Sequence, residues 1–545
     1  MRTIIKLLLF VFLIPAATAQ VPAGIIQTID QIFEPWNSAG LPGCAVGATE
    51  YGLPVFSNAY GMADLEWGIP NTPETIFEGG SVSKQFTAAA IALLILDEKL
   101  RLDDDVRQFI PELPDYGTSI TVRHLLNHTS GLRDWGSVAS ISGWNRSRRA
   151  HTHEDVLNIL SRQTELNYEP GAQYSYTNSG YNLMAILVDR VSGMSFAEFS
   201  DQRIFAPLGL ESTQWRDDFR RIVKGRSSSY NVSRDGSVEI NRPVEDVHGN
   251  GGILTTVQDL LTWNQALNDQ RFGERFTELM EQPGVLNSGL EIGYAGGLSY
   301  SDKFGAAAIE HTGSTAGYRA YTGRIKDKGL AWALLCNASN GLNAQTGDGL
   351  VKALLGDSAI EPPALVGIDL PAERLQSLAG LYRERLTGRT IELQFEQGQL
   401  MADSIELTPV SQGEFVFGQS LRTFVFESSG TDQRPAFTVS NWQAAGQVWE
   451  KVDPWSPTTD ELRALEGVYR SHDAETEFQV SLEDGQLLLK RRLDFSEPME
   501  PTYQDGFTAG YMILRFVRDT SNAEPQLSVS IPRVFDMRFE KVSDI

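Results

Sequence analysis

The order of apolar and polar positions divides the chain into two parts with different patterns. In the first part, apolar runs at 44–48 and 54–60 predict a pair of strands, and 317–337 predicts a hairpin that turns near Asp327-Lys328-Gly329. Periodic apolar positions between these strands predict helices at 25–36, 82–98, 121–127, 154–161, 179–191 and 257–267. Strands at both ends with helices between them predict an α+β domain whose first and last strands share one antiparallel sheet.

The second part, after Pro362-Pro363, has alternating strand patterns and repeats itself. The segment 378–383 (LAGLYR) recurs 87 residues later as LEGVYR, and 449–452 (WEKV) recurs 90 residues later as FEKV. This nearly constant register indicates a duplication, and each copy predicts a small antiparallel β-barrel or β-sandwich. The predicted division is a leader at 1–19, the α+β domain at 20–360, and two β-barrel-like repeats at 361–455 and 456–545.

The first residues have the pattern of a secretory signal peptide. Arg2 and Lys6 precede an apolar run at 7–14, and Ala17-Thr18-Ala19 forms a small-residue cleavage site. A membrane anchor is the alternative, but the apolar run is short for a bilayer. We therefore expect cleavage after Ala19 and a secreted or periplasmic protein with no membrane anchor.

Composition and charge exclude some classes of partner. The apolar fraction of 41% is ordinary for a globular protein, and the net charge of −24 argues against nucleic acids and anionic membranes. The two cysteines, Cys44 and Cys336, either pair in a disulfide or are two buried thiols. We find no metal-ligand spacing in the sequence, and we predict no cofactor.

A serine and a lysine lie where the predicted helix 82–98 begins. Ser81 follows two glycines, and Lys84 lies one helical turn later, on the same face. A serine hydroxyl becomes a nucleophile when a base removes its proton, and a buried lysine with a lowered pKa can be that base. Taken alone, the four residues 81–84 favour an ordinary helix start with a solvated lysine.

Two further segments carry side chains suited to acyl transfer. In the loop at 170–178, Tyr176 can accept a proton if a cation stabilises its phenolate, and Asn178 can both donate and accept. In the strand around 310–318, His311 precedes Gly313, which leaves room for a substrate backbone, and the next residue, Ser314, offers its N–H. Each segment alone also fits a packed tyrosine or an incidental histidine.

Together, the pairs Ser81/Lys84, Tyr176/Asn178 and His311/Gly313 resemble, in that order, the motifs of the serine β-lactamase-like, penicillin-recognising hydrolases, nearest to class C. The resemblance covers about 25–357 and implies a β-lactamase/transpeptidase-like domain, an antiparallel sheet flanked by helices. The third motif is His-Thr-Gly rather than Lys-Thr-Gly, and with the duplicated tail this resembles D-aminopeptidases. Because a histidine is largely neutral at pH 7, we expect weakened recognition of a terminal carboxylate.

The resemblance also implies a role for each residue. Ser81 attacks a carbonyl to form an acyl-enzyme, while Lys84 and Tyr176 share the proton transfers. The N–H groups of Ser81 and Ser314 form the oxyanion hole. Asn178 orients Lys84 and the substrate, and His311 and Gly313 line the pocket. In D-aminopeptidases a loop of the last barrel trims the pocket, and 493–505 is the segment predicted to do so here. The alternatives for the duplicated tail are a partner-binding module and a stabilising appendage.

The motifs leave the substrate open, because acyl transfer to serine uses the same groups for esters and amides. The favoured interpretation is a peptidase or amidase of substrates that contain D-amino acids. An esterase, a weak β-lactamase and a D,D-carboxypeptidase are alternatives on the same fold. A non-catalytic, penicillin-binding-like sensor is the alternative from another class. The expected partner is a small peptide, amide or ester.

Overall fold

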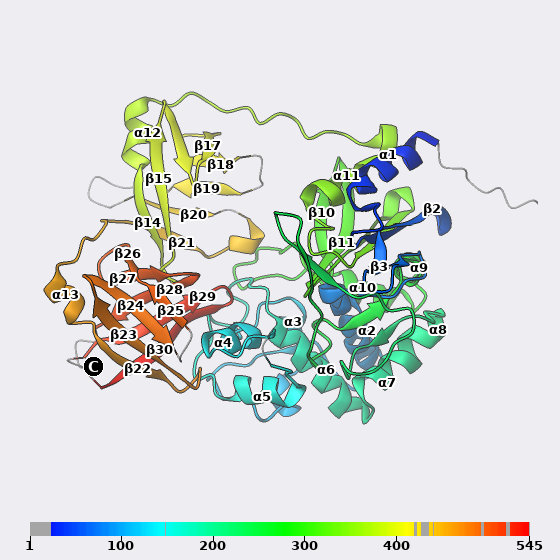
Figure 1. Ribbon diagram of the computed structural model, residues 1–545, viewed down its shortest axis with the longest axis horizontal. Helices are drawn as coiled ribbons and strands as arrows, with labels where there is room; N and C mark the ends of the chain where they lie inside the picture. Colours follow the sequence, from blue (N-terminus) through cyan, green and yellow to red (C-terminus); the bar gives the residue numbers. More distant parts are fainter. Residues whose placement is uncertain are drawn as a thin grey trace, which may run out of the picture.

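The computed structural model describes residues 23–147, 149–418, 422–426, 435–439, 441–491, 495–518 and 524–543. The predicted leader and its cleavage site lie outside these residues. Figure 1 shows an α+β domain on the right and two β-rich bodies on the left, one above the other. None of the described helices is long and apolar enough to cross a membrane.

The α+β domain is built on a six-stranded antiparallel sheet in the order β10-β11-β12-β13-β1-β2. As predicted, strands from both ends of the domain lie side by side, because β1 pairs with β13. Cys44 and Cys336 face each other in that pairing and form a disulfide, so they are not two buried thiols. The strands are β10 (Ser299–Lys303), β11 (Ala306–Thr315), β12 (Tyr318–Ile325), β13 (Leu330–Cys336), β1 (Cys44–Glu50) and β2 (Leu53–Tyr60).

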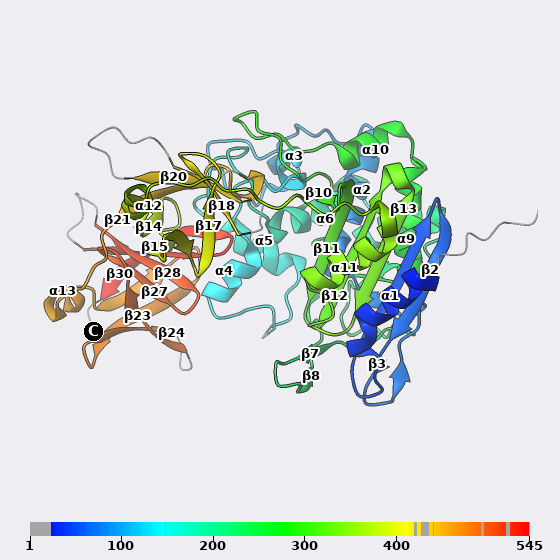
Figure 2. The ribbon, with the colours of Figure 1, turned by 90° about the horizontal axis from the view of Figure 1, so that it is seen from above.

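Helices cover both faces of this sheet (Figure 2). On one face, α1 (Ala23–Phe33) and α11 (Ala344–Leu355) pack on each other and on the sheet. On the other face, α9 (Val257–Asn268) contacts β1 and β13. Behind it, α2 (Ser83–Leu96) is buried from Ser83 to Leu94, which its small alanine side chains permit. This burial fixes the position of the residues at the N-terminus of α2.

The remaining elements of the domain are short. The predicted helices at 121–127, 154–161 and 179–191 are confirmed as α3, α5 and α6, whereas α11 was missed because Gly347 and Gly349 interrupt its pattern. The other helices are α3 (Val122–Leu126), α4 (Trp135–Ile141), α5 (His153–Ser161), α6 (Asn178–Ser192), α7 (Phe196–Ser200), α8 (Ala206–Leu208) and α10 (Glu274–Glu281). The small strands are β3 (Met62–Asp64), β4 (Ile69–Pro70), β5 (Phe77–Glu78), β6 (Gln214–Trp215), β7 (Tyr230–Val232), β8 (Val238–Ile240) and β9 (Ile253–Thr255).

The duplicated tail forms two antiparallel β-structures, as predicted. The first barrel is closed by eight strands: β14 (Gly380–Glu384), β15 (Thr390–Glu396), β16 (Gln399–Ala402), β17 (Ile405–Pro409), β18 (Glu414–Phe417), β19 (Thr423–Phe426), β20 (Ala436–Val439) and β21 (Val448–Val452). The second barrel is a nearly closed nine-stranded sheet: β22 (Gly467–Ser471), β23 (Thr476–Glu483), β24 (Gln486–Arg491), β25 (Phe495–Pro498), β26 (Glu500–Pro501), β27 (Gly506–Ala509), β28 (Met512–Val517), β29 (Gln526–Ile531) and β30 (Val534–Ser543). Helices α12 (Ala372–Leu378) and α13 (Thr459–Arg463) precede them.

The same hydrogen bond marks the duplication in both barrels. Tyr382 donates its hydroxyl to the carbonyl of Leu378, and Tyr469 donates to the carbonyl of Leu465, at 2.8 and 2.9 Å. These residues belong to the repeated LAGLYR and LEGVYR segments. The sequence repeat is therefore a repeat of structure.

The two barrels differ in how they join the α+β domain. The apolar core of the second barrel is continuous with the main core of that domain, whereas the core of the first barrel is separate. At the second-barrel interface, buried Arg133 forms an ion pair with Asp473 at 2.7 Å. Arg491 donates to the carbonyls of Ser140 and Ile141. The second barrel is thus fixed firmly against the domain that carries the predicted motifs.

Candidate active site

Ser81 lies on a tight turn that enters α2. It belongs to a single 3₁₀ turn, Gly80–Val82, and α2 begins two residues later. Gly80 has a φ of +51°, and a Cβ on it would lie 2.7 Å from the backbone nitrogen of Ser314. A Cβ on Gly313 would lie 2.0 Å from the carbonyl oxygen of Gly79. Glycine at 313 therefore lets β11 pack against this turn, and the expected room for a substrate backbone at its Cα is occupied by the chain itself.

Lys84 is completely buried below Ser81 and contacts three oxygen atoms. Its Nζ lies 3.3 Å from Ser81 Oγ, 3.0 Å from Asn178 Oδ1 and 2.7 Å from the carbonyl oxygen of Asn250. Burial lowers the pKa of Lys84 well below its usual value, and the charge of Arg533 lowers it further. Of the three oxygens, only that of Ser81 carries a proton of its own. A neutral Lys84 amine can therefore donate to Asn178 and Asn250 and accept from Ser81.

Asn178 is held at the N-terminus of α6. Helix α6 begins at this residue, one position before the predicted start, and Thr177 caps it. The Asn178 backbone N–H donates to Asp134 Oδ2 at 2.7 Å. A carboxylate at a helix N-terminus is favourable because it meets unpaired N–H groups and the positive end of the dipole. The side chain of Asn178 is thereby directed at Lys84.

Tyr176 precedes α6 and lies over the lysine. The Lys84 Nζ is 4.8 Å from the centre of the Tyr176 ring, and the Arg533 guanidinium is 5.0 Å from it. The ring also packs on His128, with 4.2 Å between centroids. Burial raises the pKa of Tyr176 above its usual value, although its hydrogen bond with Ser81 and the charge of Arg533 lower it. The expected phenolate is therefore not favoured, and Tyr176 is a neutral phenol beside Ser81.

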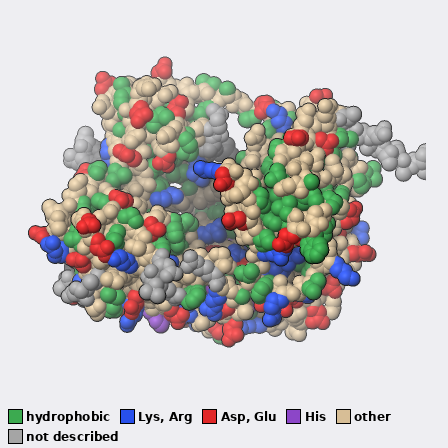
Figure 3. All heavy atoms as spheres, viewed as in Figure 1, with side chains coloured by type: hydrophobic (Ala, Val, Ile, Leu, Met, Phe, Trp, Pro, Cys, Tyr) green, Lys and Arg blue, Asp and Glu red, His purple; other side chains and the backbone are tan. Residues whose placement is uncertain are grey.

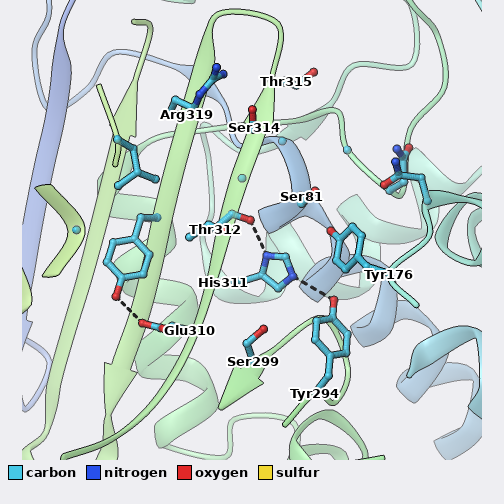
Figure 4. Close-up of a pocket in the computed structure, with 18 of the residues that line it drawn as sticks. Ser81, Tyr176, Tyr294, Ser299, Glu310, His311, Thr312, Ser314, Thr315 and Arg319 are labelled. Atoms are coloured by element: carbon cyan, nitrogen blue, oxygen red, sulfur yellow. Dashed lines mark hydrogen bonds between the residues drawn. The ribbon is translucent and has the colours of Figure 1, made fainter. Parts of the chain in front are cut away.

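His311 is buried on β11 and bonded at both ring nitrogens. Its Nε2 lies 3.0 Å from the Tyr294 hydroxyl, and its Nδ1 lies 2.6 Å from the Thr312 carbonyl oxygen (Figure 4). Burial, with the nearby charge of Lys84, lowers the pKa of His311 to about 4. The histidine is therefore neutral at pH 7, as expected for this motif. Tyr294, which holds it, has no signal in the sequence that sets it apart.

These side chains line one cavity of about 820 Å³ between the α+β domain and the barrels. It brings together Ser81, Tyr176, Asn178, His311, Gly313 and Ser314, with Lys84 buried in its floor. Further lining residues that sequence reasoning missed are Arg146, Tyr174, Asn250, Tyr294, Arg319, Trp442, Gln443 and Arg533. Among the described residues, no group of His, Cys, Asp and Glu is arranged to hold a metal ion.

Both barrels reach this cavity, but not through the predicted segment. Residues 493 and 494 lie outside the described part of the chain, and none of 495–505 lines the cavity. The connection between β20 and β21 contributes Trp442 and Gln443, and the turn between β29 and β30 contributes Arg533. The expectation that the last repeat contacts the pocket is confirmed, and its assignment to 493–505 is wrong. The turn at Arg533 is too short for its sequence to mark it as a pocket loop.

Comparison with known proteins agrees with this architecture. The beta-lactamase family model matches residues 25–356. A D-aminopeptidase from Gluconobacter oxydans is 27% identical over 363 residues, which cover 65% of this chain and 65% of that protein. Penicillin-binding protein 4* from Bacillus subtilis is 31% identical over 291 residues, which cover 50% of this chain and 62% of that protein. Each match therefore spans less than two thirds of the relative's own length.

Solved structures share the fold. The octameric penicillin-binding protein homologue from Pyrococcus abyssi has a TM-score of 0.54 at 20% identity and covers 87% of this chain and 99% of its own. The D-amino acid amidase from Ochrobactrum anthropi has a TM-score of 0.52 at 23% identity. The match covers 61% of this chain and 98% of the amidase chain. The family model matches more than half of the chain, and Ser81, Lys84 and Tyr176 meet at one cavity, so this chain belongs to the beta-lactamase family.

Proposed function

We propose that the protein is an exported peptidase or amidase that hydrolyses substrates containing D-amino acids through an acyl-Ser81 intermediate. The observation that carries the proposal is the position of Lys84. It is fully buried, its pKa is lowered, and of its three hydrogen-bond contacts among the described residues Ser81 alone can give it a proton. This is the arrangement that an activated serine nucleophile requires.

In the acylation step, Ser81 Oγ bonds to the substrate carbonyl carbon while its proton passes to Lys84 Nζ. The backbone N–H groups of Ser81 and Ser314 stabilise the resulting oxyanion. When the carbon–nitrogen bond breaks, the leaving nitrogen takes the proton of the Tyr176 hydroxyl, and Lys84 returns its proton to Tyr176. Water then adds to the acyl-enzyme with Lys84 as base, and its collapse releases the acid and restores Ser81.

Two kinds of observation support the D-amino-acid part of the proposal. The relatives include proteins named D-aminopeptidase and D-amino acid amidase. The third motif is His311-Thr312-Gly313, as the resemblance to D-aminopeptidases implies. Export is supported by the signal pattern of residues 1–19 and by the Cys44–Cys336 disulfide, since disulfides persist in oxidising compartments.

The test is hydrolysis of D-alanine and L-alanine p-nitroanilides, p-nitrophenyl acetate and a chromogenic cephalosporin by wild type and Ser81→Ala. We expect cleavage of the D-anilide by wild type, little cleavage of the L-anilide, and none of either by the variant. Cleavage of the acetate alone would identify an esterase, and cleavage of the cephalosporin alone a β-lactamase. Equal activity of Ser81→Ala on the D-anilide would overturn the proposed mechanism.

A further inference from the structure

The loop that follows α3 supports the loop that carries Tyr176. The carbonyl oxygen of Thr129 accepts from the backbone N–H of Gly171 at 2.7 Å. His128 begins the supporting loop with a φ of +57°, a left-handed conformation that is uncommon for residues other than glycine. Its side chain is completely buried. A residue keeps this conformation only where the contacts around it fix it.

His128 holds the backbone on both sides of Tyr176. Its carbonyl oxygen accepts from the backbone N–H of Ser175 at 2.9 Å. Its ring nitrogen Nδ1 accepts from the backbone N–H of Thr177 at 3.2 Å. One residue of a separate loop therefore fixes the chain immediately before and immediately after Tyr176.

The His128 ring also contacts the Tyr176 side chain. The two ring centroids are 4.2 Å apart, and the rings are tilted by 36°. Behind this pair, the His128 ring packs on Tyr181 and Tyr294, with centroid distances of 5.0 and 4.8 Å. A ring packed among buried aromatic side chains has little freedom to move. The phenol of Tyr176 is thus held against a fixed surface.

The hydrogen bond from Thr177 defines the protonation of the ring. Because Nδ1 accepts this bond, it carries no proton, and the proton of the neutral ring is on Nε2. Among the described residues, Nε2 has no hydrogen-bond partner. Burial and the nearby charge of Lys84 lower the pKa of His128 well below its usual value. The ring is therefore neutral at pH 7 and acts by contact, not by proton transfer.

A neutral ring also suits the charges around it. Lys84 and Arg533 both lie over the Tyr176 ring, at 4.8 and 5.0 Å from its centre. Figure 3 shows Lys and Arg side chains in and beside the hollow between the α+β domain and the barrels. Protonation of His128 would add another cation and would remove Nδ1 as the acceptor for Thr177. The contact that holds the chain after Tyr176 thus requires the neutral form.

We propose that His128 is a positioning residue that holds the Tyr176 hydroxyl where it protonates the leaving group. The inference rests on the proposed function, in which the leaving nitrogen takes the proton of Tyr176. A leaving nitrogen needs this proton when the carbon–nitrogen bond breaks, whereas p-nitrophenolate leaves as a stable anion. Loss of the His128 contacts should therefore impair cleavage of amides more than cleavage of activated esters.

The test compares D-alanine p-nitroanilide with D-alanine p-nitrophenyl ester, which share the acyl group and differ in the leaving group. Hydrolysis of the ester without enzyme is subtracted, and the measured quantity is the anilide-to-ester ratio of kcat/KM. Tyr176→Phe sets the scale and should lower this ratio about 100-fold. His128→Phe keeps a ring but no acceptor, and it should lower the ratio about 10-fold, the size of one lost hydrogen bond.

A conservative variant should rescue the ratio. His128→Asn keeps an acceptor at the same distance along the side chain, and asparagine tolerates a positive φ. We expect it to retain most of the wild-type ratio. The effect should also depend on Tyr176: adding His128→Phe to Tyr176→Phe should change the ratio less than about twofold, because the group that His128 positions is absent.

The matched control is His124→Phe, the same substitution on α3 itself. His124 accepts from the backbone N–H of Thr121 in the capping box of that helix. This variant loses a helix cap, but its anilide-to-ester ratio should equal that of wild type. Labelling of Ser81 by a fluorophosphonate identifies the variants that fold, and His128→Leu replaces His128→Phe if the latter does not label.

Three results would overturn the positioning role. The first is an unchanged ratio in a labelled variant that lacks the acceptor, and the second is a ratio in His128→Asn as low as that in His128→Phe. The third is an unchanged ratio in Tyr176→Phe. In each case, Ser81-dependent cleavage of the anilide would leave the proposed function standing. If neither substrate is cleaved in a Ser81-dependent way, both proposals are wrong.

Discussion

The two barrels arose from one duplicated unit but contribute differently to the cavity. In both, the connection between the last two strands faces the hydrolase domain: Trp442 and Gln443 lie between β20 and β21, and Arg533 lies between β29 and β30. The first connection offers an aromatic and a neutral amide side chain, and the second a cation. The duplication therefore fixed which loop meets the pocket, and later divergence of single residues decided what each loop does there.

The barrels also differ in how they are held. The second shares a continuous core with the hydrolase domain and buries the Arg133–Asp473 ion pair at its interface. The first has its own core, and Trp442 meets Tyr174 edge to face at 4.7 Å between ring centroids. Arg533, whose charge acts on Lys84, is supplied by the barrel that is fixed more firmly.

The largest expected difference concerns stability. Asp473→Ala removes the near carboxylate of the buried Arg133 guanidinium and leaves only the exposed Glu165, at 4.0 Å, which costs about 3–5 kcal/mol. Glu450→Ala removes a partly exposed partner of Arg385 within the first barrel and should cost less than about 1 kcal/mol. Thermal unfolding followed by calorimetry should show a large fall in the first melting transition for Asp473→Ala alone.

A double variant gives the control for this comparison. Arg133→Met with Asp473→Leu removes both charges together and should recover most of the loss, because no unpaired charge stays buried. Equal melting temperatures for Asp473→Ala and Glu450→Ala would show that the two barrels are held alike, against our interpretation.

The second prediction concerns pH. The charge of Arg533 disfavours protonation of Lys84 and so lowers the pKa of that amine. In Arg533→Gln this pKa rises, and the unprotonated base is populated only at higher pH. The acid limb of the kcat/KM profile for a neutral ester should therefore move to higher pH. Trp442→Ala removes no charge and should leave the position of the limb unchanged. A shift to lower pH in Arg533→Gln would contradict the assignment of Lys84 as base.

The smallest expected effect is on packing at the first barrel. Trp442→Ala removes the edge-to-face contact with Tyr174, worth about 0.5–1.5 kcal/mol beyond its apolar area. We expect KM to rise about threefold to tenfold, with little change in kcat, because the wall of the pocket loosens while Ser81 and Lys84 stay in place. Trp442→Phe should retain most of the contact and serves as the matched control. A loss in kcat as large as that of Ser81→Ala would show that the first barrel does more than shape the pocket.

Local patterns carried most of what the sequence could predict. Ser81 and Lys84 are three residues apart on one helix start, so their contact follows from helical geometry. That β1 and β13 share one antiparallel sheet, and that the tail is duplicated, follow from strand patterns and repeat spacing. The motifs also placed Tyr176, Asn178 and His311 around the same cavity.

Long-range packing decided what the sequence could not. Arg533 is more than 350 positions from Tyr176, and its neighbourhood has no pattern that links it to the cavity. The segment 493–505 is acidic and contains prolines, but composition says nothing of the direction in which a strand connection faces. The protonation of Tyr176 likewise depends on burial. Burial raises the pKa of Tyr176 by more than the charge of Arg533 lowers it.

The most direct test of the account is mass spectrometry of the protein after brief reaction with a fluorophosphonate. We predict a single covalent adduct on the peptide that contains Ser81, with labelling that speeds up as pH rises through the pKa of Lys84 and no adduct in Ser81→Ala. Labelling of another residue, or an unchanged adduct in Ser81→Ala, would contradict the assignment of Ser81 as the nucleophile.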